Sequence, residues 1–181
     1  MVHADPMVVT PFLRWWFTAL FVLPGLFFLV RCLVRRVTAV RISDGLHVLM
    51  CAGMIVMMWP AAGAVPVAAQ LAVFGLGTLW FAGLVVVGYD DCEWPRSWGA
   101  HAHHAIMMAG MVWMVAIMSM QDHVVPGLQA GIAAVLAVLL LFGAGAVAVR
   151  ASRAASGVPL PVAADVLMSV GMAGTTLVLI T

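Results

Sequence analysis

The chain contains six long apolar stretches, and this feature limits most strongly what it can fold into. A helix that crosses a bilayer needs about 20 predominantly apolar residues, and each stretch meets or approaches that length. Because lipid offers no hydrogen bonds to the backbone, the favoured form inside a membrane is the α-helix. We therefore expect an all-α fold, a polytopic membrane bundle of about six transmembrane helices. The expected helices cover residues 12–33, 46–62, 67–88, 101–120, 128–149 and 162–180.

The scarcity of charge leads to the same class of protein. Of the 181 residues, 65% are hydrophobic and only 8% are charged, whereas a soluble domain carries roughly 25% charged residues. The net charge of +1 provides no basic patch for nucleic acid. No phosphate-binding loop, nucleophile elbow or zincin motif is present. We expect a single integral membrane domain over residues 1–181, surrounded by the lipid bilayer, that is not an enzyme.

The arginines lie mostly on one side of the expected membrane. Seven arginines fall in or beside the loops that follow the first, third and fifth stretches: Arg31, Arg35, Arg36, Arg41, Arg96, Arg150 and Arg153. The opposite side has only Arg14. Because positive charge collects on the cytoplasmic side of membrane proteins, we expect a plasma-membrane protein with both termini outside the cytoplasm. The three cysteines, Cys32, Cys51 and Cys92, are odd in number and lack a C-x-x-C spacing, which predicts free thiols.

The methionines mark an internal threefold repeat. Twelve of the fourteen lie in the second, fourth and sixth stretches. Segments of these stretches align without gaps from His47, His104 and Asp165, which are 57 and 61 residues apart. Repeats at a regular spacing usually report repeated structural units. The three tandem helical hairpins that we expect cover about residues 12–62, 67–120 and 128–181.

Each copy of the repeat carries two methionines at offsets of three and seven from its first residue. Residues at these offsets share one face of a helix. The six methionines are Met50, Met54, Met107, Met111, Met168 and Met172. If the three helices meet about one axis, the methionines form two stacked triads, about 6 Å apart along the axis, beside a polar ring of His47, His104 and Asp165. A glycine between the two methionines of each copy favours close approach of the helices.

The methionine pattern points to soft metal chemistry. Thioether sulfur is a soft, neutral ligand that suits Cu(I) and suits zinc, magnesium or calcium poorly. Weak ligands at successive levels let an ion enter and leave, as transport requires. The polar ring can receive the ion before release, since an acid inside an apolar stretch is costly and usually functional. We expect His101 and His103 just outside the membrane, as uptake or release groups. The plain alternative is that flexible methionines fill gaps between packed helices.

Two resemblances follow from the same residues. The phrases His47-Val-Leu-Met-Cys-Ala-Gly-Met and His104-Ala-Ile-Met-Met-Ala-Gly-Met resemble a family of actinobacterial membrane proteins known only as a domain of unknown function. This resemblance covers nearly the whole chain and implies a polytopic membrane protein. The Met-x-x-x-Met pairs are similar to the pair in eukaryotic Ctr-type copper transporters, which are homotrimers that build two methionine triads. The similarity implies that one chain here supplies all three copies.

Three functions are consistent with these features. The first is a Cu(I)-binding membrane protein that transports or delivers copper through stacked methionine triads. The second is a structural or assembly subunit of a larger membrane complex, such as a respiratory complex, because the short loops leave no room for a soluble domain. The third is a haem b membrane protein with His47 and His104 as axial ligands.

Overall fold

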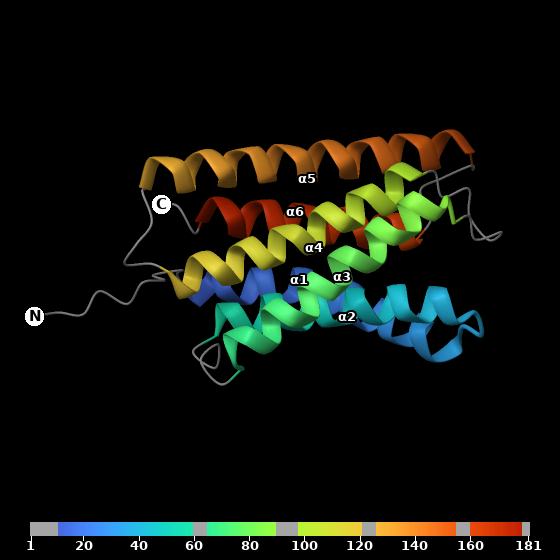
Figure 1. Ribbon diagram of the computed structural model, residues 1–181, viewed down its shortest axis with the longest axis horizontal. Coiled ribbons are helices and arrows are strands. Elements are labelled where there is room, and N and C mark those ends of the chain that lie inside the picture. The colour runs from blue at the N-terminus through green and yellow to red at the C-terminus, as the bar shows by residue number, and fades with distance from the viewer. Residues whose placement is uncertain (1–10, 60–64, 90–97, 121–125, 155–159, 179–181) are drawn as a thin grey trace, which may run out of the picture.

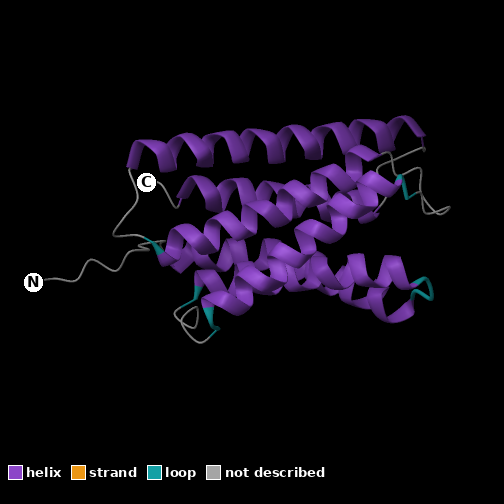
Figure 2. Ribbon diagram, in the orientation of Figure 1, coloured by secondary structure: helices purple, strands orange, loops and turns teal. Residues whose placement is uncertain are grey.

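The computed structural model describes residues 11–59, 65–89, 98–120, 126–154 and 160–178. Within these residues the fold is entirely helical, and no strand occurs (Figure 2). The helices are α1 (Pro11–Val34), α2 (Thr38–Met58), α3 (Val67–Val87), α4 (Trp98–Ser119), α5 (Pro126–Ala154) and α6 (Leu160–Val178). All six are long and apolar enough to cross a membrane. The all-α fold expected from the sequence is therefore confirmed, and the chain is a helical membrane protein.

The largest difference from the expected boundaries is the start of α2, which begins at Thr38 and not at residue 46. Hydropathy alone assigns Asp44 to a loop, because an isolated charge is costly in an apolar helix. In the structure, Arg31 Nε of α1 lies 3.3 Å from Asp44 Oδ2 of α2. This ion pair lets α2 start two turns earlier, so that only residues 35–37 connect the first two helices.

The six helices pack as three antiparallel hairpins that form a closed ring. The most extensive contacts join α1 to α2, α3 to α4, and α5 to α6. The hairpins then meet one another through α1 and α6, through α4 and α5, and less extensively through α2 and α3. In Figure 1 the odd-numbered helices run from the left end of the bundle to the right, and the even-numbered helices return. Contacts between α6 and α1 thus bring the last helix beside the first.

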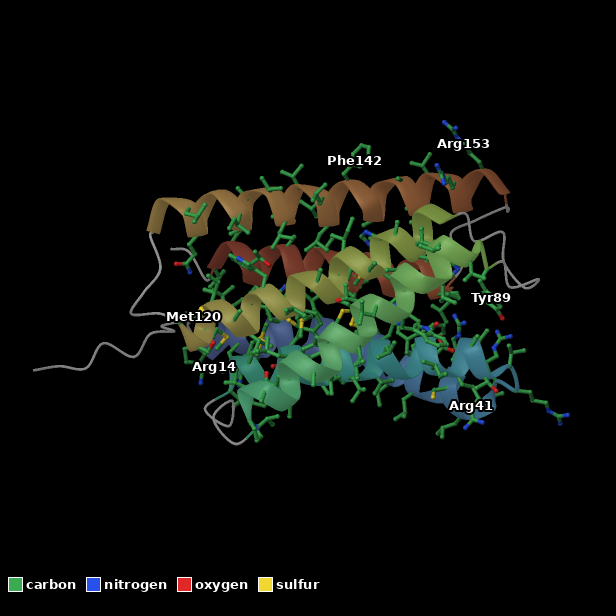
Figure 3. All side chains as sticks on the ribbon, viewed as in Figure 1. Arg14, Arg41, Tyr89, Met120, Phe142 and Arg153 are labelled. Atoms are coloured by element: carbon green, nitrogen blue, oxygen red, sulfur yellow. The ribbon has the colours of Figure 1, made fainter. Side chains whose placement is uncertain are left out.

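Within this ring, the even-numbered helices lie on the inner side and the odd-numbered helices on the outer side. In their apolar segments, 44% of α2, 44% of α4 and 56% of α6 is buried, against 17% of α1, 17% of α3 and 22% of α5. The odd-numbered helices therefore cover the even-numbered ones and present their own apolar side chains outward. Phe142 of α5, which is 76% exposed, points away from the bundle (Figure 3). Such side chains suit contact with lipid chains.

Two of the outer helices carry a repeat of their own, formed by phenylalanines. Phe21 and Phe28 of α1 are buried, and so are Phe74 and Phe81 of α3. The two phenylalanines of each pair are seven positions apart, and the second pair follows the first by 53 positions. The repeat predicted from the sequence rests on the methionine-bearing, even-numbered helices. These matched phenylalanines are the signal that aligns α1 with α3.

Glycines of the inner helices receive the rings of these phenylalanines. A Cβ atom at Gly53 of α2 would lie 2.6 Å from Phe74 Cζ, and one at Gly171 of α6 would lie 2.8 Å from Phe21 Cζ. We expected the glycines to permit close approach of helices. The structure shows how they do so, since the space of the missing side chain is filled by an aromatic ring from α1 or α3.

Replacing Gly171 with alanine is expected to destabilise the bundle by about 1–3 kcal/mol, the usual cost of overpacking a well-packed core. The ring of Phe21 is fully buried, so it has little room to move aside. The matched control is Gly75→Ala in α3, where an added Cβ meets nothing within 4 Å. There the better helix propensity of alanine is expected to raise stability by up to about 1 kcal/mol. Unfolding midpoints in detergent, followed by circular dichroism, test both; equal midpoints would contradict the packing described here.

Candidate metal centre

Two histidines and an aspartate from the three inner helices meet inside the bundle. They are His47 of α2, His104 of α4 and Asp165 of α6, and one possible ligand atom of each lies within 4.8 Å of the others. His47 Nε2 is 3.7 Å from Asp165 Oδ1, and His104 Nε2 is 3.3 Å from Asp165 Oδ2. All three side chains are almost fully buried. We call these three residues the polar cluster. The structure brings together the members of the ring expected from the repeat.

Aromatic rings from the outer helices enclose the polar cluster. The Phe28 ring stacks on His47, with ring centroids 4.5 Å apart and planes 18° apart. Phe81 lies 5.5 Å from the His47 ring and 5.2 Å from the His104 ring. Phe28 of α1 and Phe81 of α3 thus cover the histidines of the cluster. These contacts fix the orientation of the imidazole rings.

The two histidines are too close together to serve as axial ligands on opposite faces of one haem. Their ring centroids are 4.6 Å apart, and the rings meet edge to face at 88°. A haem ligated on both faces needs its whole macrocycle between the two imidazoles. The contact between His47 and His104 leaves no space for that plane. This geometry argues against the haem hypothesis.

The six methionines of the repeat lie in the interior, next to the polar cluster. Each is exposed by 1% or less, and Figure 3 shows sulfur atoms gathered along the middle of the bundle. We call Met50, Met107 and Met168 the first methionine layer, and Met54, Met111 and Met172 the second. In the second layer, a Cβ at Gly53 would lie 3.1 Å from Met111 Cε, and one at Gly110 would lie 3.7 Å from Met172 Cε. Methionines of one inner helix therefore reach the glycine of another.

Two hydroxyl groups of α6 contact methionine sulfur, and the sequence did not single them out. Ser169 Oγ lies 3.7 Å from Met107 Sδ, and Thr176 Oγ1 lies 3.7 Å from Met114 Sδ. Ser169 Oγ also donates to the carbonyl oxygen of Asp165 at 2.8 Å. The repeat carried a signal for Ser169, because Cys51 and Met108 occupy the same position in the first two copies.

From the sequence we expected His101 and His103 just outside the membrane segment, but both lie within the candidate span of α4, which begins at Gly99. Helix α4 starts at residue 98, three residues earlier than expected, and the two side chains are only 2% and 3% exposed. His101 Nε2 is 3.1 Å from the carbonyl oxygen of Tyr89. His103 Nε2 is 2.9 Å from Ser169 Oγ, and its ring packs against Gly143 of α5. Both histidines therefore hold neighbouring segments together inside the protein.

The thiols behave as expected where the structure describes them. Cys32 is half-buried and Cys51 is buried, and both are free. Cys92 lies outside the described residues.

Residues 39–179 match the domain of unknown function DUF5134. The chain belongs to this family. Uncharacterized proteins of Mycobacterium tuberculosis and Mycobacterium bovis are 33% identical to it over 111 residues, which is 59% of this chain and 50% of each relative. The chain thus spans about half the length of the curated relatives that it matches. No solved structure matches the chain. DUF5134 membership confirms the resemblance to a family of unknown function, so activity has to be argued from the site.

A buried ion pair lies one helical turn from the polar cluster of this DUF5134 domain. Asp44 precedes His47 by three residues on α2 and is 1% exposed. Its partner Arg31 also lies over Phe27 and Phe28, with its guanidinium carbon 5.7 and 5.8 Å from the two ring centroids. Phe28 in turn stacks on His47. The pair thus fixes the end of the first hairpin against the cluster.

Removing one partner of this pair is expected to destabilise the protein by roughly 3–5 kcal/mol, because the other charge is left buried and uncompensated. We expect that loss for Arg31→Met. The double variant Arg31→Met/Asp44→Leu should recover much of it, since both charges are then gone. Arg36→Met, on an exposed side chain, serves as the control and should stay within about 0.5 kcal/mol of the parent. A double-mutant cycle in detergent measures the coupling, and additive losses would rule out the pair as a unit.

Proposed function

We propose that the protein binds Cu(I) in its methionine layers and transports or delivers the ion within the membrane. The observation that supports the proposal is the position of the six methionines. They occupy matched places on the three inner helices, and each is exposed by 1% or less. Thioether sulfur is soft, so it favours Cu(I) over harder ions. It also carries no proton that must leave before the metal binds.

Packing alone does not explain why these six interior positions hold methionine. In lipid the interior gains no hydrophobic driving force over the outside, so shape and contact density decide which side chain fills a site. Two of the outer helices, α1 and α3, fill their matched interior positions with phenylalanine, as Phe21 and Phe74 do. The inner helices use flexible, polarizable methionine at offsets of three and seven in all three copies of the repeat. A binding role for sulfur accounts for this division between the two sets of helices.

The arrangement along the axis supports passage of an ion from one layer to the next. The two methionine layers are separated by four residues, which is about 6 Å of helix. The polar cluster lies next to the first layer, three residues nearer the start of each inner helix. Binding at several weak sites in series permits both uptake and release. In this proposal His47, His104 and Asp165 form the polar end of the path.

The charges at the two ends of the bundle support an orientation. Arg41 and Arg153 lie at one end in Figure 3, and Arg14 lies at the opposite end with Met120. The polar cluster is on the arginine-rich side of the methionine layers, because the inner helices begin there. By the positive-inside rule, we propose that this end faces the cytoplasm and that both termini lie outside it.

Replacing Met50, Met107 and Met168 together by leucine is expected to abolish copper binding. Leucine keeps the volume and the apolar character of methionine, so the fold should change little, while the soft ligands of the first layer are lost. The measurement is the copper content of the purified full chain after loading with Cu(I) under reducing conditions. The parent protein is expected to retain copper, and the variant to retain little or none.

The matched control replaces three other methionines of the same protein, Met58, Met118 and Met120, by leucine. It changes the same number of sulfur atoms outside the two layers, and copper should remain. If the parent binds no copper and instead co-purifies with another membrane protein, the role as an assembly subunit takes the place of this proposal.

Reporter fusions test the proposed orientation. Alkaline phosphatase attached to the carboxyl terminus of the full chain is expected to be active in a bacterial host, because the enzyme folds only outside the cytoplasm. Green fluorescent protein at the same terminus is expected to stay dark, since it fails to fold after export through the general secretion pathway. The reverse pair of results would place the arginine-rich end outside.

A further inference from the structure

The polar cluster differs in chemistry from the methionine layers beside it. It offers two imidazole nitrogens and one carboxylate from three separate helices. Imidazole and carboxylate are ligands for divalent first-row ions such as Zn²⁺, whereas carboxylate is a poor ligand for the soft ion that thioethers select. The cluster therefore needs an explanation of its own.

The orientation of His47 is the one that metal-binding histidines adopt. Its Nδ1 lies 2.7 Å from the carbonyl oxygen of Ser43. A carbonyl oxygen only accepts hydrogen bonds, so Nδ1 carries the proton and donates it. In the neutral ring the lone pair is then on Nε2, the nitrogen that faces Asp165. Metal ligands usually show this pattern, with the second ring nitrogen donating to a carbonyl or a carboxylate.

The distances within the cluster agree with ligands around one small ion. Bonds from Zn²⁺ to nitrogen and oxygen are about 2.0–2.2 Å, so neighbouring ligands of a tetrahedral site lie about 3.3–3.5 Å apart. His104 Nε2 is 3.3 Å from Asp165 Oδ2 and His47 Nε2 is 3.7 Å from Asp165 Oδ1, and one ligand atom from each residue lies within 4.8 Å of the others. Small rotations of the side chains therefore bring three ligands around one ion. Three protein ligands leave a fourth position, as in zinc sites that bind water or a substrate.

The charge of Asp165 also favours a cation at this point. A carboxylate inside an apolar bundle is costly unless it is paired or coordinates a metal. The stacked Phe28 ring and the nearby Phe81 ring keep the cluster in apolar surroundings. A divalent ion held by Asp165 and two neutral imidazoles supplies the compensating charge.

We propose that His47, His104 and Asp165 form a binding site for a divalent first-row metal ion, with Zn²⁺ as the best match. The site is separate from the methionine layers and does not depend on their binding Cu(I). The protein then carries two kinds of metal site on the same three helices, one built from sulfur and the other from nitrogen and oxygen.

Cobalt titration of the full chain tests the site, because Co²⁺ takes the place of Zn²⁺ and has a visible spectrum. The protein is purified in detergent, freed of any histidine tag and treated with a chelator. We expect Co²⁺ to bind with about one ion per chain, to give the strong visible bands of a tetrahedral site, and to be displaced by Zn²⁺. Asp165→Asn and His47→Gln should each weaken binding by more than about 100-fold, since even the loss of a supporting residue costs 10–100-fold.

The control variant is Met58→Leu, which lies on α2 outside both methionine layers, leaves all three ligands in place and should bind Co²⁺ like the parent. X-ray absorption of the cobalt-loaded parent needs no variant to fold; imidazole and oxygen ligands without sulfur are expected. Failure of the parent to bind Co²⁺ would show that the cluster is a proton-linked ion pair only, and would overturn the proposal. Sulfur ligands, or unchanged binding in a correctly folded Asp165→Asn protein, would overturn it as well. A parent protein that binds Co²⁺ but not Cu(I) would refute the copper function and support this site.

Discussion

The fold depends on how one acidic side chain is accommodated in an apolar bundle. Asp165 lies on α6, and both of its carboxylate oxygens face histidines, one from α2 and one from α4. This contact is where all three inner helices meet, and it lies inside a ring whose outer helices have few polar groups of their own. Because an uncompensated carboxylate is costly in such surroundings, the helices that supply His47 and His104 are held in register with α6. The methionine layers follow one and two turns further along the same helices, so their alignment derives from that register.

The polar cluster departs from the threefold symmetry of the repeat. Strict repetition would place a histidine at all three positions, and the ring would be neutral. The third copy has Asp165 there, Thr175 where the others have methionine, and Ser169 where they have Cys51 and Met108. Its outer helix α5 likewise buries small residues such as Ala133 in place of phenylalanine. A homotrimer cannot make such changes in one subunit alone. Three copies within one chain can, and here the change adds a negative charge and hydroxyl groups on one side of the axis.

The sequence was sufficient for the number of helices, for the repeat and for the members of the polar cluster. Apolar length determines a spanning helix, and residues at the same place in three repeats must meet if the repeats surround an axis. Hydropathy failed where a polar residue finds its partner in another helix. Asp44 was assigned to a loop because its pairing with Arg31 is a tertiary contact. His101 and His103 were placed outside for the same reason, since the Tyr89 carbonyl and Ser169 hydroxyl that accommodate them are distant in sequence. The phenylalanine repeat of α1 and α3 is present in the sequence. Apolar residues are so frequent in membrane-spanning helices, however, that a match between two of them is not distinctive.

Placing two donor sets on the same helices has a chemical consequence. His47 and Met50 are three residues apart, which is about 4.5 Å along a helix, and yet their side chains prefer ions of different softness. In the two proposed sites, donor chemistry and not the width of a pore would sort the ions. The aromatic rings of Phe28 and Phe81 strengthen that sorting, because apolar surroundings raise the cost of leaving the carboxylate without a cation. In these two proposals the same three helices would hold a divalent ion at the arginine-rich end and a monovalent soft ion toward the middle.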